Sequence, residues 1–157
     1  MQITRTADYG VRVMTHLAML PPGTRMTVAQ LAHQGDASVA FTGKILQRLV
    51  GARLVVSHRG YEGGFELGRP SNTISLLDIV TALEGPLCLN QCLPGGPGCD
   101  RAVWCGAQDV WANAQAALAA VLAAESLERL AATAARERPS AKGTARQDSL
   151  SGAQANS

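Results

Sequence analysis

Apolar residues at the start of the chain recur with the period of an amphipathic helix. Ala7, Val11, Met14 and Ala18 are spaced by four, three and four positions, and residues three or four apart share one face of a helix. A second apolar stripe runs beside the first. The pattern therefore predicts a helix over residues 6–19 that is buried on two sides.

Three shorter apolar-periodic stretches follow, and each begins just after a residue that can cap a helix. Thr27, Ser38 and Ser75 can each accept a hydrogen bond from a free N–H of the first turn. The first two of these helices are joined by a turn at Gly35, which is the arrangement of a helix-turn-helix unit. The predicted helices span residues 28–34, 39–50 and 76–83.

Two β-rich runs come after the helix-turn-helix unit. The sequence LVVSH at residues 54–58 is rich in β-branched side chains, and residues 65–67 can pair back with it across a glycine-containing turn. Arg59 and Gly60 lie at the tip of this hairpin. Helix, turn, helix and hairpin in this order predict a winged helix. The expected fold class is therefore mainly α, with a small β-hairpin wing and a long dimerisation helix after the head.

The third predicted helix has one apolar and one polar face. Phe41, Ile45, Leu46 and Leu49 are expected to face inward, which leaves the polar residues free to contact base edges or phosphates. Residues 1–80 carry eight Lys or Arg and five Asp or Glu, a net charge of +3 that suits a DNA-binding head. The candidate DNA contacts are Ser38, Thr42, Lys44, Gln47 and Arg48 on this helix, with Arg59 and Gly60 on the wing.

An alanine-rich segment over residues 107–124 predicts a long helix whose apolar surface needs a partner. Val110, Ala114, Ala117 and Val121 form one stripe along it, and large apolar patches are rare on monomers. We expect a homodimer through this helix. Two heads related by a two-fold axis would then read a palindromic operator in double-stranded DNA.

The composition bears on the compartment in which the protein acts. Arg5, Asp8 and Arg12 interrupt the N-terminus before any apolar segment, so we expect no signal peptide. No apolar run approaches the roughly 18 residues that a membrane span needs. A cytoplasmic protein with no membrane partner is therefore expected. In that compartment, clustered cysteines bind metal or respond to redox state more often than they form structural disulfides.

All four cysteines of the chain lie in one segment, at positions 88, 92, 99 and 105, with PGGPG between the second and third. Proline and glycine exclude helix and strand there, so this loop can bring the sulfurs together. Thiolates are the ligands of iron–sulfur clusters, zinc and copper(I). Structural zinc and a metal-free thiol switch remain alternatives. The sequence has no cysteine pair separated by two residues, no glycine-rich nucleotide loop and no convincing Cys–His partner. Nothing in it therefore suggests an enzyme.

Several motifs occur in a specific order along residues 1–135, although each alone is weak. They are the opening MQITRTADYGVR, the helix FTGKILQRLV, the wing RGYEGGFELGRP, the segment ISLLDIVTALEGP, the helix VWANAQAALAAVL and the ending SLERLA. With the last three cysteines, this ordered set resembles the family of bacterial winged-helix iron–sulfur transcriptional regulators that includes IscR, NsrR and RirA.

The resemblance implies an iron–sulfur cluster, of the 2Fe-2S or 4Fe-4S type, held by Cys92, Cys99 and Cys105. It also implies a fourth ligand that varies within the family. In IscR-like members a histidine stands where this chain has Gln108. In NsrR-like members an aspartate in the first helix of the partner subunit completes the site, and Asp8 occupies that position. Cys88 is the other candidate for the fourth ligand.

These observations predict a transcriptional repressor whose DNA affinity responds, through a cluster, to nitric oxide, redox state or the supply of iron and clusters. The alternative is a thiol-based redox regulator or a zinc-containing winged-helix regulator without such a cluster.

A short helix is expected over residues 127–135, followed by polar residues that predict disorder. The predicted units are a winged-helix head (1–86), a cysteine loop (87–106), a dimerisation unit (107–135) and a disordered tail (136–157).

Overall fold

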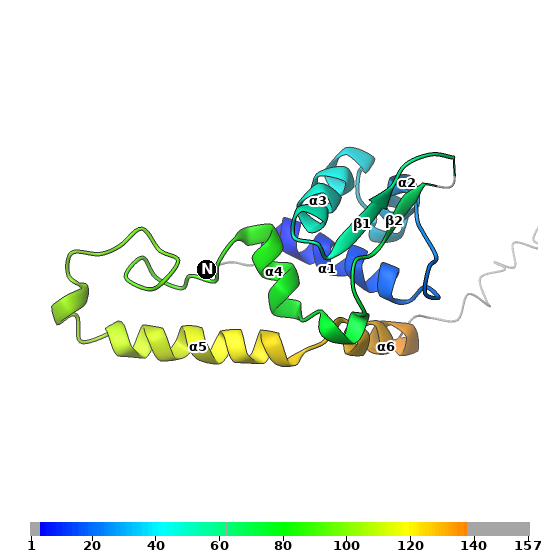
Figure 1. The fold of residues 1–157 in the computed structure, drawn as a ribbon. Coiled ribbons are helices and arrows are strands. Elements are labelled where there is room, and N and C mark those ends of the chain that lie inside the picture. The colour runs from blue at the N-terminus through cyan, green and yellow to red at the C-terminus, as the bar shows by residue number, and fades with distance from the viewer. Residues whose placement is uncertain (1–3, 62, 138–157) are drawn as a thin grey trace, which may run out of the picture.

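The computed structural model describes residues 4–61 and 63–137, and six α-helices and one two-stranded antiparallel sheet lie within them (Figure 1). The fold is a winged helix followed by a long helix, which confirms the predicted fold class. Every predicted helix lies within two residues of its observed bounds. The helices are α1 (Arg5–Ala18), α2 (Val28–Gly35), α3 (Val39–Gly51), α4 (Leu76–Glu84), α5 (Gln108–Ala124) and α6 (Leu127–Glu137). The strands are β1 (Val55–His58) and β2 (Gly64–Leu67), and two 3-10 turns, η1 (Ser71–Thr73) and η2 (Ala102–Trp104), complete the described secondary structure.

Side-chain caps start the helices where the sequence predicts them. The Thr27 hydroxyl accepts a hydrogen bond from the Gln30 N–H (3.3 Å), and the Gln30 side chain accepts one from the Thr27 N–H (2.8 Å). Ser75 and Asp78 form the same reciprocal pair at the start of α4. Asp36 caps the end of α2, and its left-handed backbone (φ 52°) makes the turn into α3. Local chemistry thus sets the helix-turn-helix boundaries.

The core of the head is built around α1, which packs against α2, α3, α4 and α6. The approach of α4 requires Gly10 to lack a side chain, because a Cβ there would lie 2.0 Å from Leu83 Cδ1 and 3.7 Å from Ile45 Cγ2. Burial of aliphatic surface at this junction stabilises the head by about 25 cal/mol per Å². The largest fully buried side chains include Met14, Leu31, Ile45, Leu46, Leu49, Ile74, Ile79 and Leu127.

The hairpin is tied to the head at its base. Phe65 of β2 exchanges two backbone hydrogen bonds with Met26, which precedes α2 (3.1 and 2.8 Å). Glu66 on the same strand lies 2.6 Å from His58 Nε2 of β1 and 3.6 Å from Arg25 Nε. The Glu66 side chain therefore joins both strands to the connection between α1 and α2. These contacts fix the direction in which the wing points.

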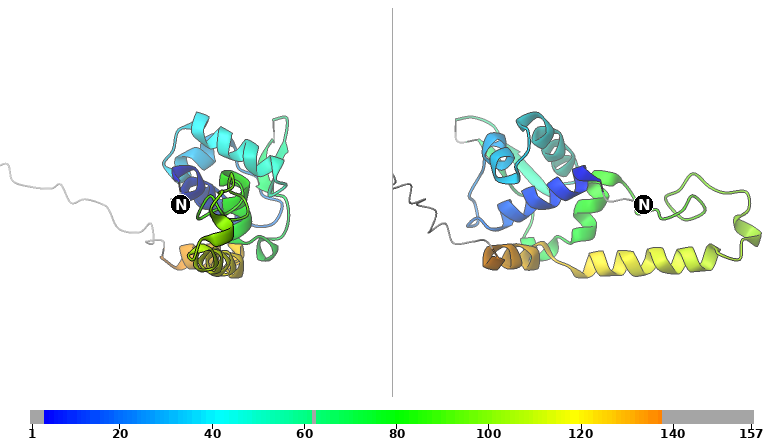
Figure 2. Two further views of the ribbon diagram at one scale, coloured as in Figure 1. Left: turned by 90° about the vertical axis from the view of Figure 1, so that its left-hand side faces the viewer. Right: turned by 180° about the vertical axis from the view of Figure 1, so that it is seen from behind.

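The cysteine loop leads away from the head, α5 runs back toward it, and α6 packs against it (Figures 1 and 2). Leu122, near the end of α5, is the buried residue of that helix. The Leu127 N–H donates to the Ile74 carbonyl, and the Leu76 N–H donates to the Glu125 carbonyl, each at 2.8 Å. The connection from α5 to α6 is thus joined to the start of α4. None of the described helices is long and apolar enough to cross a membrane.

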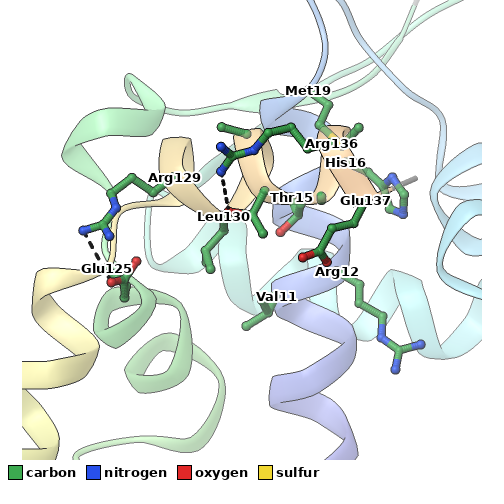
Figure 3. A pocket seen from close by; sticks show the side chains of 13 residues that line it. Val11, Arg12, Thr15, His16, Met19, Glu125, Arg129, Leu130, Arg136 and Glu137 are labelled. Carbon is green, nitrogen blue, oxygen red and sulfur yellow. Dashed lines mark hydrogen bonds and ion pairs between the residues drawn. The ribbon is translucent and has the colours of Figure 1, made fainter. Parts of the chain in front are cut away.

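α6 packs on α1 and leaves a groove of about 580 Å³ between the two helices (Figure 3). Val11 of α1 and Leu130 of α6 are among its apolar lining residues, and Arg129, paired with Glu125 at 3.4 Å, is among the charged ones. α6 extends to Glu137, so the first two residues of the expected tail are helical. The remainder of that prediction, residues 138–157, lies outside the described residues.

Candidate nucleic-acid interface and cysteine loop

The outer face of α3 carries exposed polar side chains. Ser38 caps the helix by accepting a hydrogen bond from the Phe41 N–H (3.2 Å), which leaves its hydroxyl proton free to donate. Lys44 and Gln47 are both exposed, three residues apart on the helix surface. α3 and the hairpin lie on the side of the head opposite α6 (Figure 1). One duplex can therefore approach both elements without meeting α6.

Thr42 does not lie on this outer face, which corrects the sequence-based expectation that it contacts DNA. Only 1% of its surface is exposed. Thr42 precedes Ile45, Leu46 and Leu49 by three, four and seven positions, so it belongs to the same buried stripe of the helix. Its polar side chain suggests an outward position, but helical geometry and its small size place it in the core.

Arg48 is exposed along α3, but its guanidinium is already engaged. Nη1 donates a hydrogen bond to the carbonyl of Leu83. That carbonyl lies in the last turn of α4, where carbonyl groups lack partners within the helix and a positive charge is favourable. Arg48 therefore connects α3 to the C-terminal end of α4. A guanidinium has five N–H donors, so Arg48 retains others for a further partner.

Arg59 is exposed at the end of β1, and the turn after it depends on two glycines. Gly60 has a left-handed backbone (φ 102°), and its carbonyl accepts a hydrogen bond from the Gly63 N–H (3.0 Å). A Cβ at Gly63 would lie 2.5 Å from the carbonyl oxygen of His58. The tight turn therefore presents Arg59 and Gly60 at the tip of the wing, as the sequence predicts.

Two exposed side chains beside these residues were not identified from the sequence. Tyr61 follows Gly60 and is fully exposed, and Val39 follows Ser38 and is 51% exposed. The exposure of Tyr61 could be predicted from the glycine-rich turn around it, because a side chain in such a turn has no core within reach. No sequence signal predicts the exposure of Val39, because its spacing of three residues from Thr42 places it on the inward stripe. It is exposed because it lies in the first turn of α3, beyond the edge of the core.

The first half of the cysteine loop folds into a compact turn that carries Cys88 and Cys92. Across this turn the Gly98 N–H donates to the Gln91 carbonyl (3.0 Å). Gly96 packs so closely that a Cβ there would lie 2.6 Å from the same carbonyl oxygen. The glycines and prolines of this segment therefore form a defined turn as well as interrupting regular structure.

The second half of the loop carries Cys99 and Cys105, which flank η2. The Ala102 N–H donates to the Cys99 carbonyl (3.1 Å), and the Cys105 N–H donates to the Ala102 carbonyl (3.3 Å). The Gln108 N–H then donates to the Cys105 carbonyl (3.1 Å). Cys105 thus lies at the entry to α5, and any force on its sulfur acts on the start of that helix.

All four thiols are free and half-buried. Within residues 4–61 and 63–137, no three Cys, His, Asp or Glu side chains lie close enough together to hold a metal ion. Cys88 donates through its thiol to the Asn90 carbonyl (3.1 Å). Asp8 is exposed in the first turn of α1, and its carboxylate lies 2.9 Å from Arg12 Nη2. The structure therefore places the four sulfurs on one loop without gathering them.

α5 exposes the apolar stripe that the sequence predicts. Val110 and Val121 are each 64% exposed, and Ala114 and Ala117 between them are exposed as well. Leu122, on the flank of this stripe, is buried instead. The helix therefore has one face turned to the rest of the chain and a separate apolar face without a partner among the described residues.

A helix-turn-helix unit with an exposed polar helix face and a wing defines a winged-helix DNA-binding regulator. Residues 3–133 match the Rrf2 family, described as iron-dependent transcriptional regulators, and the chain belongs to this family. The family resemblance noted in the sequence is confirmed. Members of the family are transcriptional regulators, so the expectation that the chain is not an enzyme is also confirmed.

Relatives and solved structures agree with this assignment. An HTH-type transcriptional regulator of Mycobacterium tuberculosis is 34% identical over 131 residues, which cover 83% of this chain and 81% of the relative. CymR, the global cysteine regulator of B. subtilis, has a TM-score of 0.70 at 27% identity, covering 85% of this chain and 98% of CymR. IscR of T. potens shares the fold, with a TM-score of 0.69 at 23% identity over 89% of this chain and 93% of IscR.

Replacing Arg48 should destabilise the head. Arg48→Ala is expected to lower the free energy of unfolding by about 1–2 kcal/mol, because a charge-assisted hydrogen bond to the end of α4 is lost. Lys44→Ala, one turn earlier on the same helix, should change it by less than about 0.5 kcal/mol, as expected for an exposed site. Urea denaturation measures both variants. Equal values would show that the Arg48–Leu83 bond contributes no net stability.

Proposed function

We propose that this chain is a cytoplasmic homodimer that represses transcription at a palindromic operator, and that an iron–sulfur cluster on the cysteine loop sets its affinity for DNA. One observation carries the proposal. All four cysteines are free, and they lie on the one loop that joins the DNA-binding head to a helix with an exposed apolar face. A change at this loop can therefore act on the head and on the dimer together.

The donor set fits such a cluster. Iron–sulfur clusters are held by cysteine thiolates, and Cys92, Cys99 and Cys105 are available without breaking any disulfide. Binding requires the loop to draw these three sulfurs together. The segments between them contain the glycine-rich turn and η2, which have few side chains to repack. When bound, the cluster would supply iron chemistry that reacts with nitric oxide or oxidants.

Asp8 of the partner subunit is the proposed fourth ligand, with Cys88 as the other candidate. Asp8 is exposed and paired with Arg12, and exposed pairs of this kind contribute little stability. Its carboxylate can therefore leave Arg12 for a neighbouring subunit. A carboxylate is a harder ligand than thiolate, so Asp8 would also be the first ligand to leave. Once released, Asp8 could pair with Arg12 again and would no longer tie the head to the partner subunit.

A change in this tie would act on DNA binding through geometry. Two recognition helices must match the spacing of the two half-sites, so a small reorientation of the heads abolishes specific binding. Reversing the ratio of two head conformations from 99:1 to 1:99 requires that the two cluster states differ by about 5.5 kcal/mol in their preference for these conformations. One metal bond across the dimer and its neighbouring contacts can supply energy on this scale.

The proposed DNA surface combines Ser38, Lys44 and Gln47 of α3 with Arg59 and Gly60 of the wing. α3 supplies groups for base edges and phosphates in the major groove, and Arg59 suits a phosphate or the minor groove. Arg48 is a secondary candidate, because one of its donors is engaged with α4. Thr42 is not part of this surface, since it is buried.

Removing two charges from this surface should weaken DNA binding. Lys44→Ala combined with Arg59→Ala is expected to lower operator affinity and to flatten its dependence on salt. For each phosphate contact that is lost, DNA binding releases one counterion fewer. If the parent dimer neutralises some 6–10 phosphates, its affinity should fall by about 10³–10⁵-fold between roughly 50 and 200 mM salt. Fluorescence anisotropy across this salt range measures both quantities.

The matched control removes the same charge from the opposite side of the head. Arg129→Ala combined with Arg136→Ala changes α6, which lies away from α3 and the wing (Figure 1). This variant should retain the parent's salt slope. Unchanged affinity in the Lys44/Arg59 variant, or an equal loss in the α6 variant, would exclude the proposed surface.

The dimer should depend on the exposed stripe of α5. Val110→Glu combined with Val121→Glu is expected to give monomers at micromolar concentration, because two charges would be buried without partners. Ala116→Glu combined with Ala123→Glu adds the same charge to another exposed face of the helix and should remain dimeric. Sedimentation velocity measures the state of each. A monomeric parent would refute the homodimer.

The ligand assignment is tested by three variants purified without oxygen. Cys99→Ala should lose the cluster. Asp8→Ala should keep a cluster with an altered visible spectrum and a weaker response of DNA binding to nitric oxide or oxidant. Arg12→Ala, which removes the partner of Asp8, should keep the parent spectrum. A normal cluster in Cys99→Ala contradicts the assignment, and an unchanged Asp8→Ala moves the fourth ligand to Cys88.

The alternative is a regulator that responds through its thiols or holds zinc, without an iron–sulfur cluster. The likeness to CymR, a global cysteine regulator of which an oxidized form has been solved, favours the thiol-based form of this reading. Iron and sulfide analysis of the anaerobically purified parent distinguishes the two. A protein without iron and without visible absorbance would replace the cluster proposal with this one.

A further inference from the structure

The side chain of Gln115 links α5 to the first half of the cysteine loop. Its Oε1 accepts a hydrogen bond from the Leu89 N–H (2.9 Å), and its Nε2 donates to the Pro94 carbonyl (3.4 Å). Leu89 follows Cys88 directly, and Pro94 comes two residues after Cys92. We propose that Gln115 is a positioning residue that holds this turn against α5 and thereby limits access to the thiols of Cys88 and Cys92.

The two bonds need a side-chain amide. The Leu89 N–H requires an acceptor and the Pro94 carbonyl requires a donor. Glutamine offers both from one group, whereas glutamate is an acceptor only and methionine, of similar length, forms at best a weak bond. Gln115 is half-buried on a helix of which half of the other residues are alanine. A polar side chain there is explained by the loop that it binds rather than by solvent.

Holding the turn at two points is enough to hold all of it, because the turn is internally bonded. The Leu93 N–H donates to the Asn90 carbonyl, and the Gly98 N–H to the Gln91 carbonyl, each at 3.0 Å. The Cys88 thiol donates to the same Asn90 carbonyl (3.1 Å). Leu93, at the centre, is buried. The turn therefore moves toward or away from α5 as a unit, and its two cysteines move with it.

The other two cysteines provide a comparison within the same molecule. The backbone of Cys99 and Cys105 is bonded to η2 and to the start of α5, and neither residue contacts Gln115 through any bond found in the described residues. Loss of the Gln115 amide should therefore change Cys88 and Cys92 while leaving Cys99 and Cys105 as they are. A general loosening of the protein would change all four alike.

The effect on thiol access does not require a cluster, but its consequence for a cluster rests on the proposed function. If Cys92 is a ligand and the loop closes by moving Cys99 and Cys105 toward it, a turn held by Gln115 keeps the Cys92 sulfur at a fixed place along α5. Loss of the amide then removes one ligand from its place and shortens the lifetime of the bound cluster. The two effects are measured separately below.

The experiment uses the full-length, reduced, cluster-free protein and compares Gln115→Met and Gln115→Glu with the parent. Amide hydrogen exchange at Leu89 is followed by NMR, and the alkylation rate of each cysteine by N-ethylmaleimide is followed by mass spectrometry. The control is Asn113→Met, which changes an exposed amide on the same helix in the same way. Circular dichroism checks that α5 remains helical in each variant.

Gln115→Met should raise Leu89 exchange and the alkylation of Cys88 and Cys92 by about fivefold or more, the factor expected when at least one hydrogen bond holding a segment is lost. Alkylation of Cys99 and Cys105 should stay within about twofold, as should every rate in Asn113→Met. Gln115→Glu keeps the acceptor for Leu89, so its Leu89 exchange should rise less. An equal rise at all four cysteines, or no rise at Cys88 and Cys92, would overturn the proposal.

Cluster reconstitution then separates this proposal from the proposed function. If the parent binds a cluster, the cluster should decay faster in air when it is bound to Gln115→Met than when it is bound to Asn113→Met. If thiol access changes as expected but the parent binds no cluster, the positioning role stands and the cluster proposal fails. If the parent binds a cluster but thiol access in Gln115→Met is unchanged, the positioning role fails and the cluster proposal stands.

Discussion

The close approach of α4 to α1 at Gly10 is the contact on which the rest of the structure depends. Any side chain there would displace Leu83, which is buried at the junction of α1, α3 and α4. The carbonyl of the same leucine accepts the hydrogen bond from Arg48. Because the chain leaves α4 directly for the cysteine loop, this junction fixes both the orientation of α3 and the point from which the loop begins.

α5 has one face turned to the rest of the chain and another that is exposed. Most of the stability of a helix in a protein comes from tertiary packing, so the order of α5 depends on what it contacts. Gln115 meets the cysteine loop and Leu122 is buried near the return to the head, whereas Val110 and Val121 lie on another face that is exposed. In the proposed dimer, one rigid helix therefore has the loop on one side and the partner subunit on another.

The sequence predicts those features that are set by neighbouring residues and misses those that depend on distant ones. Caps at Thr27 and Ser75 and the period of the apolar residues are local, so helix bounds and the winged-helix class follow from them. Thr42 is polar, which suggests an outward position, but its place on the helix puts it in line with Ile45 and Leu49, so it is buried. The contact of Gln115 with the loop has no signal in the sequence, because a polar residue between two alanines on a helix suggests exposure to solvent. Whether the sulfurs converge depends on how loops of several residues close, which no local pattern determines.

One route from the cysteine loop to the recognition helix passes through the end of α4. Gly85 ends that helix with a left-handed backbone (φ 84°), and Cys88 follows three residues later. On the other side of the same helix end, Arg48 holds α3 through the Leu83 carbonyl. In the proposed regulator, a loop that draws its sulfurs together would pull on this end, and Arg48 would transmit the displacement to the helix that carries Lys44 and Gln47. In the proposed regulator the DNA-binding face and the cysteine loop thus share one short structural element, so their coupling needs no relay through the core.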